Sequence, residues 1–443
     1  MNKHDAHFQA FGYEPLRMKP AHFASGFFTA LTGQVYADEL LNRVAVTSAG
    51  RGMLGNYAPE RVLETLKDQR LIEDGLNQPD VELLRKQVNG IVDNDSAMFP
   101  AYRPFSARGN DYTFISPRLL STASRVDGFA GFFVLTVLAD TGPGRTVLDT
   151  GRALADEPAG TLEQFVEPLL GDIDPQPRDL RDKYEERFGV LDPARVAHIA
   201  AAMRVETDAL ERLCAAMQDY SHYRKIRFYI LGLLAWLFAY LLKTAASTSS
   251  ATPLLFFDFL GDRHGRIRSQ SRACYARLRE GVRRSYTEFA RAGRIQPDPI
   301  AENVFSRKGR PEEQNFYFLE EHFRDVAVRM GYAQPRAGNV QQKHLELQPD
   351  TLRILMLSIL DGDVQHPITL DEACTRLWDT WKVLVGARAE DHETLRTQGY
   401  FGFDEEDLSR NAAAFADRLK SLHMAFEPSD GLVLCSTDIG KVL

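Results

Sequence analysis

Arginine recurs at helical spacing between residues 268 and 291, and a row of arginines suits the binding of phosphate groups. The guanidinium presents a planar fork of hydrogen-bond donors, and each nucleic-acid phosphate that it neutralises releases a condensed cation. At about 100° per residue, one helix edge and the face opposite it would each carry a row. The sequence therefore predicts a DNA-backbone contact through Arg268, Arg272, Arg277, Arg279, Arg283 and Arg284.

Two other interpretations of these rows stay open: a solvated helix face, or a surface that docks onto an acidic partner or onto this chain's own acidic end. An apolar stripe accompanies the arginines at steps of three and four residues, which predicts a single amphipathic helix with one face in the core. The stripe consists of Tyr275, Leu278, Val282, Tyr286 and Phe289.

A second candidate for phosphate chemistry is the strand-like FFVLTVLAD, residues 132–140, followed by TGPGRT. A phosphate-binding loop needs Gly-x-x-x-x-Gly-Lys-Ser/Thr, because its amides cradle the phosphates and its lysine reaches them. Here Ala139 stands at the first glycine position and Arg145 replaces the lysine. A tight turn is the better interpretation.

Metal-dependent nuclease chemistry needs clustered carboxylates, commonly with a lysine. Asp258, Asp262 and His264 lie near one another in the sequence, but arginines surround them and no Glu-x-Lys follows. The hydrolase signatures Gly-x-Ser-x-Gly and His-Glu-x-x-His are absent. The four cysteines stand 60 or more residues apart, which indicates buried thiols rather than a zinc site. We therefore expect no enzyme activity, cofactor or metal.

Charge is distributed unevenly along the chain. The net charge of −8 would argue against a nucleic-acid partner, but residues 262–310 hold 13 Lys/Arg against 5 Asp/Glu. Residues 349–443 hold 9 Lys/Arg against 17 Asp/Glu. The sequence thus predicts a basic segment followed by an acidic C-terminal domain.

Residues 228–242 form an uncharged apolar run that is either a membrane anchor or a buried helix. A spanning helix needs about 20 apolar residues, so the run is about one turn too short. A second apolar stretch, residues 253–260, is predicted as a buried strand that packs against this helix. The start of the chain has no apolar run typical of a signal peptide. We expect a core helix, no membrane contact and a cytoplasmic protein.

The last hundred residues predict three helices and a terminal hairpin, the elements of a winged helix. Thr369 and Glu372 form a capping-box pattern at the start of the second helix. The third helix, residues 406–423, begins next to four carboxylates that would repel phosphate. We interpret this domain as a module that binds protein rather than DNA.

The predicted fold class is mainly α: a multi-domain helical protein with a C-terminal winged-helix-like domain and few short strands. Three prolines from residue 175 to residue 193 mark a boundary. The expected domains are an N-terminal helical domain at 1–174, a central one with the apolar helix and basic segment at 175–347, and the acidic one at 348–443.

Three patches of the sequence carry a resemblance to a known family. They are the loop FPAYRPFSARGNDYTF, the helix FYILGLLAWL with the following LLFFDFLGDRHGRIRSQSRACYARL, and the ending LKSLHMAFEPSDGLVLCSTDIGKVL. In these patches the chain resembles the G subunit (DptG/DndG) of bacterial DNA phosphorothioation-dependent restriction complexes. The resemblance implies a cytoplasmic partner of P-loop and HerA-like ATPase subunits, in a system that attacks DNA lacking backbone sulfur.

Together these observations predict a non-catalytic, DNA-contacting scaffold subunit of an anti-phage defence complex, which binds the double-stranded DNA backbone and the ATPase subunits. Two alternatives stay open. One is a divergent metal-dependent nuclease whose carboxylates meet only in three dimensions. The other is a membrane-associated defence effector that uses residues 228–242.

Overall fold

The computed structural model describes residues 10–15, 20–35, 129–156, 176–177, 180–246, 253–289, 311–335, 340–360, 367–428 and 431–437. These residues fold mainly into α-helices, and each strand among them is two residues long. The expected mainly helical fold with few short strands is therefore confirmed for the described part of the chain.

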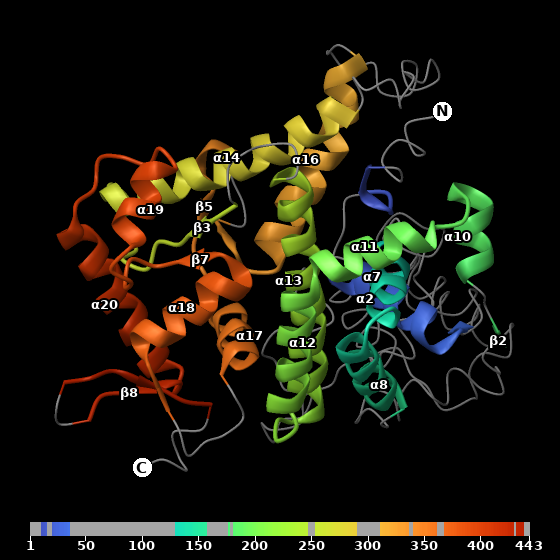
Figure 1. Cartoon of the computed structure of the whole chain (residues 1–443), viewed down its shortest axis with the longest axis horizontal. Helices are drawn as coiled ribbons and strands as arrows, with labels where there is room; N and C mark the ends of the chain where they lie inside the picture. The colour runs from blue at the N-terminus through green and yellow to red at the C-terminus, as the bar shows by residue number, and fades with distance from the viewer. Residues whose placement is uncertain are drawn as a thin grey trace, which may run out of the picture.

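The apolar run lies in α13, His222–Ala246, which stands in the middle of the molecule (Figure 1). Every residue from 228 to 242 is buried except Ala239, which is half-buried. Among the described helices, α13 is the one long and apolar enough to cross a membrane, yet 83% of its apolar window is buried inside the protein. The prediction of a core helix is confirmed.

Helix α12, Arg204–Ala216, runs beside α13 and supplies partners for its polar groups (Figure 1). The Trp236 indole donates a hydrogen bond to the Thr207 hydroxyl at 3.0 Å. At the end of α13, the Lys243 ammonium lies 2.7 Å from a Glu206 carboxylate oxygen. A helix that is apolar on nearly all sides can be buried because these few polar atoms are satisfied.

The expected strand at residues 132–140 is wrong: these residues lie in helix α7, Ala130–Ala139. A continuous apolar run does not distinguish a buried strand from a buried helix. Tertiary packing decides, because α7 lies against α2, Pro20–Thr32, and against α8, Gly142–Asp156. The backbones approach so closely that a side chain at Gly131 would collide with the backbone of Phe27. The turn expected at residues 141–146 is confined to Asp140 and Thr141, because α8 already begins at Gly142.

Two further helices complete this side of the molecule. Asp192 accepts a hydrogen bond from the Ala194 amide at 3.1 Å and so caps the helix that Pro193 begins. The two helices are α10, Leu180–Phe188, and α11, Pro193–Ala202. The helical character predicted for residues 192–243 is confirmed by α11, α12 and α13.

In the part of the chain that the structure describes, four small sheets connect the helices. The apolar stretch after α13 contributes the predicted buried strand, β3, whose parallel partner β7 comes from beyond residue 348. The pairs are β1, Gln34–Val35, with β2, Gln176–Pro177; β3, Leu255–Phe256, with β7, Val383–Leu384; and β4, Ala333–Gln334, with β5, His344–Leu345. The fourth sheet has the order β6, Ile368–Thr369, then β9, Leu434–Cys435, then β8, Ala425–Phe426, all antiparallel.

Three of the four C-terminal helices that the structure describes begin close to their predicted positions, whereas the short helix at Asp391–Thr397 was not predicted. Thr369 accepts a hydrogen bond from the Glu372 amide at 3.2 Å, as the capping pattern predicted. The predicted terminal hairpin forms as the antiparallel pair β8 and β9. The helices are α17, Pro349–Ile359; α18, Leu370–Trp381; α19, Asp391–Thr397; and α20, Glu405–Ser421.

The described parts of the predicted second and third domains share one hydrophobic core. Helix α17 packs against both α12 and α13, and β3 pairs with β7 across the expected boundary at residue 348. Two more helices lie over this core: α14, Arg266–Phe289, and α16, Pro311–Arg329. The division at 174 and 347 stays a prediction.

Candidate nucleic-acid interface

Helix α14 carries all six arginines that the sequence singled out, and it runs along one border of the molecule from α19 to α16 (Figure 1). A turn at residues 262–265 leads into it, where the Asp262 carboxylate accepts a hydrogen bond from the His264 amide at 3.0 Å. The predicted single amphipathic helix over this segment is confirmed.

One face of α14 is fixed in the core. Tyr275, Leu278 and Val282 are buried, as the apolar stripe predicted. The side chains of the last two members of the stripe, Tyr286 and Phe289, lie outside the described residues. The buried hydroxyl of Ser271 both donates to the carbonyl of Leu345 and accepts from its amide, each at 2.8 Å, and so ties α14 to β5.

Arg268 does not face solvent, which contradicts the predicted phosphate contact at this position. Its side chain is only 10% exposed; its Nε lies 2.5 Å from Asp258 Oδ2 and its Nη2 lies 3.2 Å from Glu346 Oε2. Asp258 is almost fully buried, and it also accepts hydrogen bonds from the amides of Leu260 and Gly261. Arg268 lies at the inner margin of the arginine row, where it neutralises a buried carboxylate.

Arg277 is exposed but already engaged within the chain. Its two terminal nitrogens donate to the carbonyl oxygens of Gln398, at 2.6 Å, and Gly399, at 2.7 Å. Its guanidinium carbon lies 4.2 Å from the centre of the Tyr400 ring, which is a cation–π contact. Arg277 therefore holds the loop between α19 and α20 rather than a free surface.

The other four predicted arginines lie on the outer side of α14. Arg272 and Arg284 are exposed, and Arg279 and Arg283 are half-buried. At about 100° per residue, Arg272, Arg279 and Arg283 fall within about 40° of one another on the helix. We call these three the arginine edge; it borders the buried stripe, as the sequence predicted.

The role of Arg266, the first residue of α14, was not predicted from the sequence. Its Nη1 lies 3.1 Å from Asp404 Oδ2 and 3.3 Å from Asp407 Oδ2, so it partly neutralises the acidic start of α20. A hydrogen bond from the Asp407 amide and, after it, the charge of Arg266 hold the pKa of Asp404 below its usual value. The signal in the sequence was the complementary charge of the two segments.

Asn411 of α20 was also missed, although it joins three elements. Its amide nitrogen donates to the carbonyls of Phe257, at 2.9 Å, and Val385, at 2.8 Å. Its amide oxygen accepts from the Phe259 amide at 2.8 Å. These contacts lie immediately beyond β3 and β7, so one buried side chain fixes α20 over the parallel strand pair. A single asparagine in a polar helix gives no such signal in the sequence.

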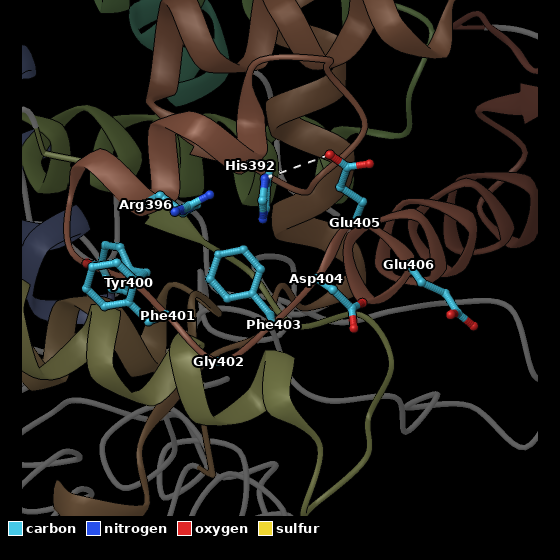
Figure 2. A pocket seen from close by; sticks show the side chains of 9 residues that line it. All are labelled: His392, Arg396, Tyr400, Phe401, Gly402, Phe403, Asp404, Glu405 and Glu406. Carbon is cyan, nitrogen blue, oxygen red and sulfur yellow. Dashed lines mark ion pairs between the residues drawn. The ribbon is translucent and has the colours of Figure 1, made fainter.

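An open pocket of about 570 Å³ lies between α19 and the start of α20 (Figure 2). It is lined by His392 and Arg396 of α19, by residues 400–403 of the connecting loop, and by residues 404–406. We call it the acidic-aromatic pocket. Figure 2 shows Arg396 on the side of Tyr400 and Phe401, and the three carboxylates on the other side of Phe403. The cavity is therefore polarised, with aromatic rings between its basic and acidic ends.

The described residues contain no group of three His, Cys, Asp or Glu side chains arranged to hold a metal ion. Of the carboxylates considered for nuclease chemistry, Asp258 is paired with Arg268. All four cysteines are buried and free, as predicted, and burial raises the pKa of Cys214 and of Cys435 to about 12. Thiols with such pKa values are protonated at neutral pH and chemically inert.

Two of the patches that resemble the G-subunit family fall in described elements, namely α13 with β3 and α14, and the end of α20 with β8 and β9. The third, the loop at residues 99–114, lies outside the described residues. The family relationship therefore stays a prediction. The chain matches no family model, no curated protein and no solved structure.

Proposed function

We propose that this protein is a non-catalytic subunit that contacts the double-stranded DNA backbone and holds partner subunits together. The observation that carries the DNA contact is the arginine edge: Arg272, Arg279 and Arg283 lie together on the outer side of a helix whose other face is anchored in the core. A row of guanidinium groups on an anchored helix can pair with successive phosphates, and such contacts read no base sequence.

The resemblance to the G subunit of phosphorothioation-dependent restriction complexes supplies the biological setting of this proposal. In that setting the partners are P-loop and HerA-like ATPase subunits, the compartment is the cytoplasm, and the process is anti-phage defence. The family resemblance and the arginine edge share Arg272, which lies in one of the three patches, whereas Arg279 and Arg283 lie outside them.

We further propose that the C-terminal elements form a winged-helix-like module that binds protein. In support, β6 precedes α18, α20 precedes the β8–β9 hairpin, and the sheet has the order β6-β9-β8. Helix α20 begins with Glu405, Glu406 and Asp407, and this start would repel the phosphates of a DNA groove. A partner protein is the occupant that such a surface favours.

The DNA contact is tested by fluorescence anisotropy with short duplexes of different sequence, over a series of salt concentrations. The triple variant Arg272→Ala, Arg279→Ala, Arg283→Ala should weaken binding to all duplexes alike. It should also flatten the dependence of log affinity on log salt by about 0.9 for each lost contact, nearly three units in all.

The matched control removes three exposed arginines elsewhere, Arg152→Ala, Arg204→Ala and Arg224→Ala, so the change in net charge is the same. This control should leave the slope unchanged. If the folded edge variant kept the wild-type slope, or if both variants flattened it equally, the arginine edge would not be the DNA contact. The edge would then bind a protein or remain solvated.

Deleting residues 349–443 is not a suitable test of the docking module. Helix α17 and strand β7 contribute to the shared core, so the deletion would expose α12, α13 and β3. Surface substitutions on α19 and α20 leave that core intact and are used below.

A further inference from the structure

The acidic-aromatic pocket adjoins a loop that already binds two arginines of its own chain. At the N-terminal end of the loop, the guanidinium of Arg277 stacks on Tyr400 and donates to two backbone carbonyls. At its C-terminal end, where α20 begins, Arg266 pairs with Asp404 and Asp407. The segment between α19 and α20 therefore uses aromatic rings and carboxylates to hold guanidinium groups.

Aromatic rings and carboxylates also line the cavity itself. Phe401 is 63% exposed, and it is the one aromatic residue among the large apolar side chains that are exposed in the described part of the chain. The side chain of Glu405 is 86% exposed and approaches His392 only to 4.0 Å. Phe403 lies between them in the pocket wall, with the His392 ring edge-on at 5.7 Å (Figure 2).

The loop displays Phe401 because glycines on either side of it adopt left-handed backbone. Gly399 has φ +78° and Gly402 has φ +86°, conformations that residues with side chains rarely adopt. The ring is thus held in solvent by a fixed backbone, and it does not fold back onto the core. Exposed aromatic side chains beside charged groups are typical anchors of protein–protein interfaces.

We infer that the acidic-aromatic pocket is the docking site for a partner protein segment that inserts an arginine side chain. The guanidinium lies against Phe401 and Phe403, and the carboxylates at the start of α20 accept its hydrogen bonds. Arginine fits better than lysine because its planar fork both stacks on a ring and pairs with a carboxylate. Arg396, at the opposite end, lies where it can pair with a carbonyl or carboxylate of the same segment.

This inference rests on the proposed docking role of the C-terminal module, and it adds the site and the chemistry of the partner. Charge excludes the alternative of a nucleic acid in this cavity, since Glu405 and Glu406 flank the aromatic ring that a base would need. The DNA contact on α14 and the protein contact on the α19–α20 loop are therefore separate surfaces.

The test selects peptides from a random 12-residue display library on the full-length protein. We expect enrichment of peptides that contain arginine beside an apolar residue, and binding of a selected peptide should fall about tenfold when its arginine is changed to lysine. The same peptide should lose at least tenfold in affinity for Phe401→Ala and for Glu405→Gln. Both side chains are largely exposed, so both variants should melt like the wild type.

The matched controls are Leu432→Ala and Asp417→Asn, which change an exposed apolar and an exposed acidic residue elsewhere in the C-terminal module. They should bind the selected peptide as the wild type does. No enrichment of arginine, or peptides that bind Phe401→Ala and Glu405→Gln unchanged, would overturn the inference. The DNA salt slope of these pocket variants should equal that of the wild type. A result that overturns the docking site can therefore be distinguished from one that overturns the proposed DNA contact at the arginine edge.

Discussion

The Arg268→Ala substitution separates a structural arginine from a DNA-binding one on the same helix. Arg268 neutralises Asp258, which is 1% exposed, and it also contacts Glu346 at the margin of the core. Removing the guanidinium leaves the Asp258 carboxylate buried without a countercharge. The expected result is a less stable protein whose DNA contact is unaltered.

The magnitude follows from the partners that Asp258 keeps. Breaking a buried ion pair by removing one member costs about 3–5 kcal/mol, because the remaining charge is uncompensated. The other carboxylate oxygen of Asp258 still accepts from the amides of Leu260, at 3.0 Å, and Gly261, at 3.2 Å. We therefore expect the lower end, a loss of about 3 kcal/mol in the free energy of unfolding.

Urea denaturation followed by tryptophan fluorescence measures this loss, with Arg272→Ala as the control on the exposed side of α14. The control should change the free energy of unfolding by less than about 0.5 kcal/mol, and should flatten the DNA salt slope by about 0.9. The double variant Asp258→Asn, Arg268→Met should recover part of the lost stability, since position 258 then carries no unpaired charge.

The opposite pattern would refute the reasoning. If Arg268→Ala unfolded at the wild-type urea concentration and flattened the salt slope, Arg268 would be a phosphate contact. The buried ion pair with Asp258 would then contribute nothing to the free energy of unfolding.

Three further predictions concern the core and its margins. Asn411→Ala should lower the free energy of unfolding by about 3–5 kcal/mol, because three buried backbone groups lose their hydrogen-bond partner; an unchanged urea midpoint would contradict this. Leu234→Lys should prevent folding, since it places an unpaired charge in the buried helix α13. Leu234→Met should lower the free energy of unfolding, measured by thermal melting, by less than about 1.5 kcal/mol. A hydrogen bond from His344 and the charge of Arg268 lower the pKa of Glu346 from 4.5. The ionised Glu346 therefore stabilises the folded protein above pH 4.5, and this stabilisation is lost as the pH falls through the lower pKa of the folded state. Glu346→Gln should remove that part of the acid sensitivity. If the variant and the wild type showed the same dependence of melting temperature on pH, this prediction would be contradicted.

The sequence by itself determined those elements whose signals are local. Residues 228–242 were recognisable as a core helix because the uncharged run is followed by a second apolar stretch that could pack against it, although α13 as a whole is long enough to cross a membrane. The stripe of α14, the N-cap at Thr369 and the terminal hairpin follow from spacing, capping chemistry and turn residues within a few positions of each element. Local interactions of this kind are encoded by neighbouring residues.

Tertiary structure decided whatever depends on residues far apart in the chain. Residues 130–139 form a helix rather than a strand because α2 and α8 cover them, and an apolar run fits either structure. Arg268 and Arg272 are equivalent in the sequence, yet one faces a buried carboxylate and the other faces water, because β3 and β5 lie against one side of α14 only. The acidic-aromatic pocket also required the fold, since the loop that carries Phe401 is held in place by Arg277 from more than a hundred residues away. Long-range contacts select among the alternatives that local sequence leaves equal in energy.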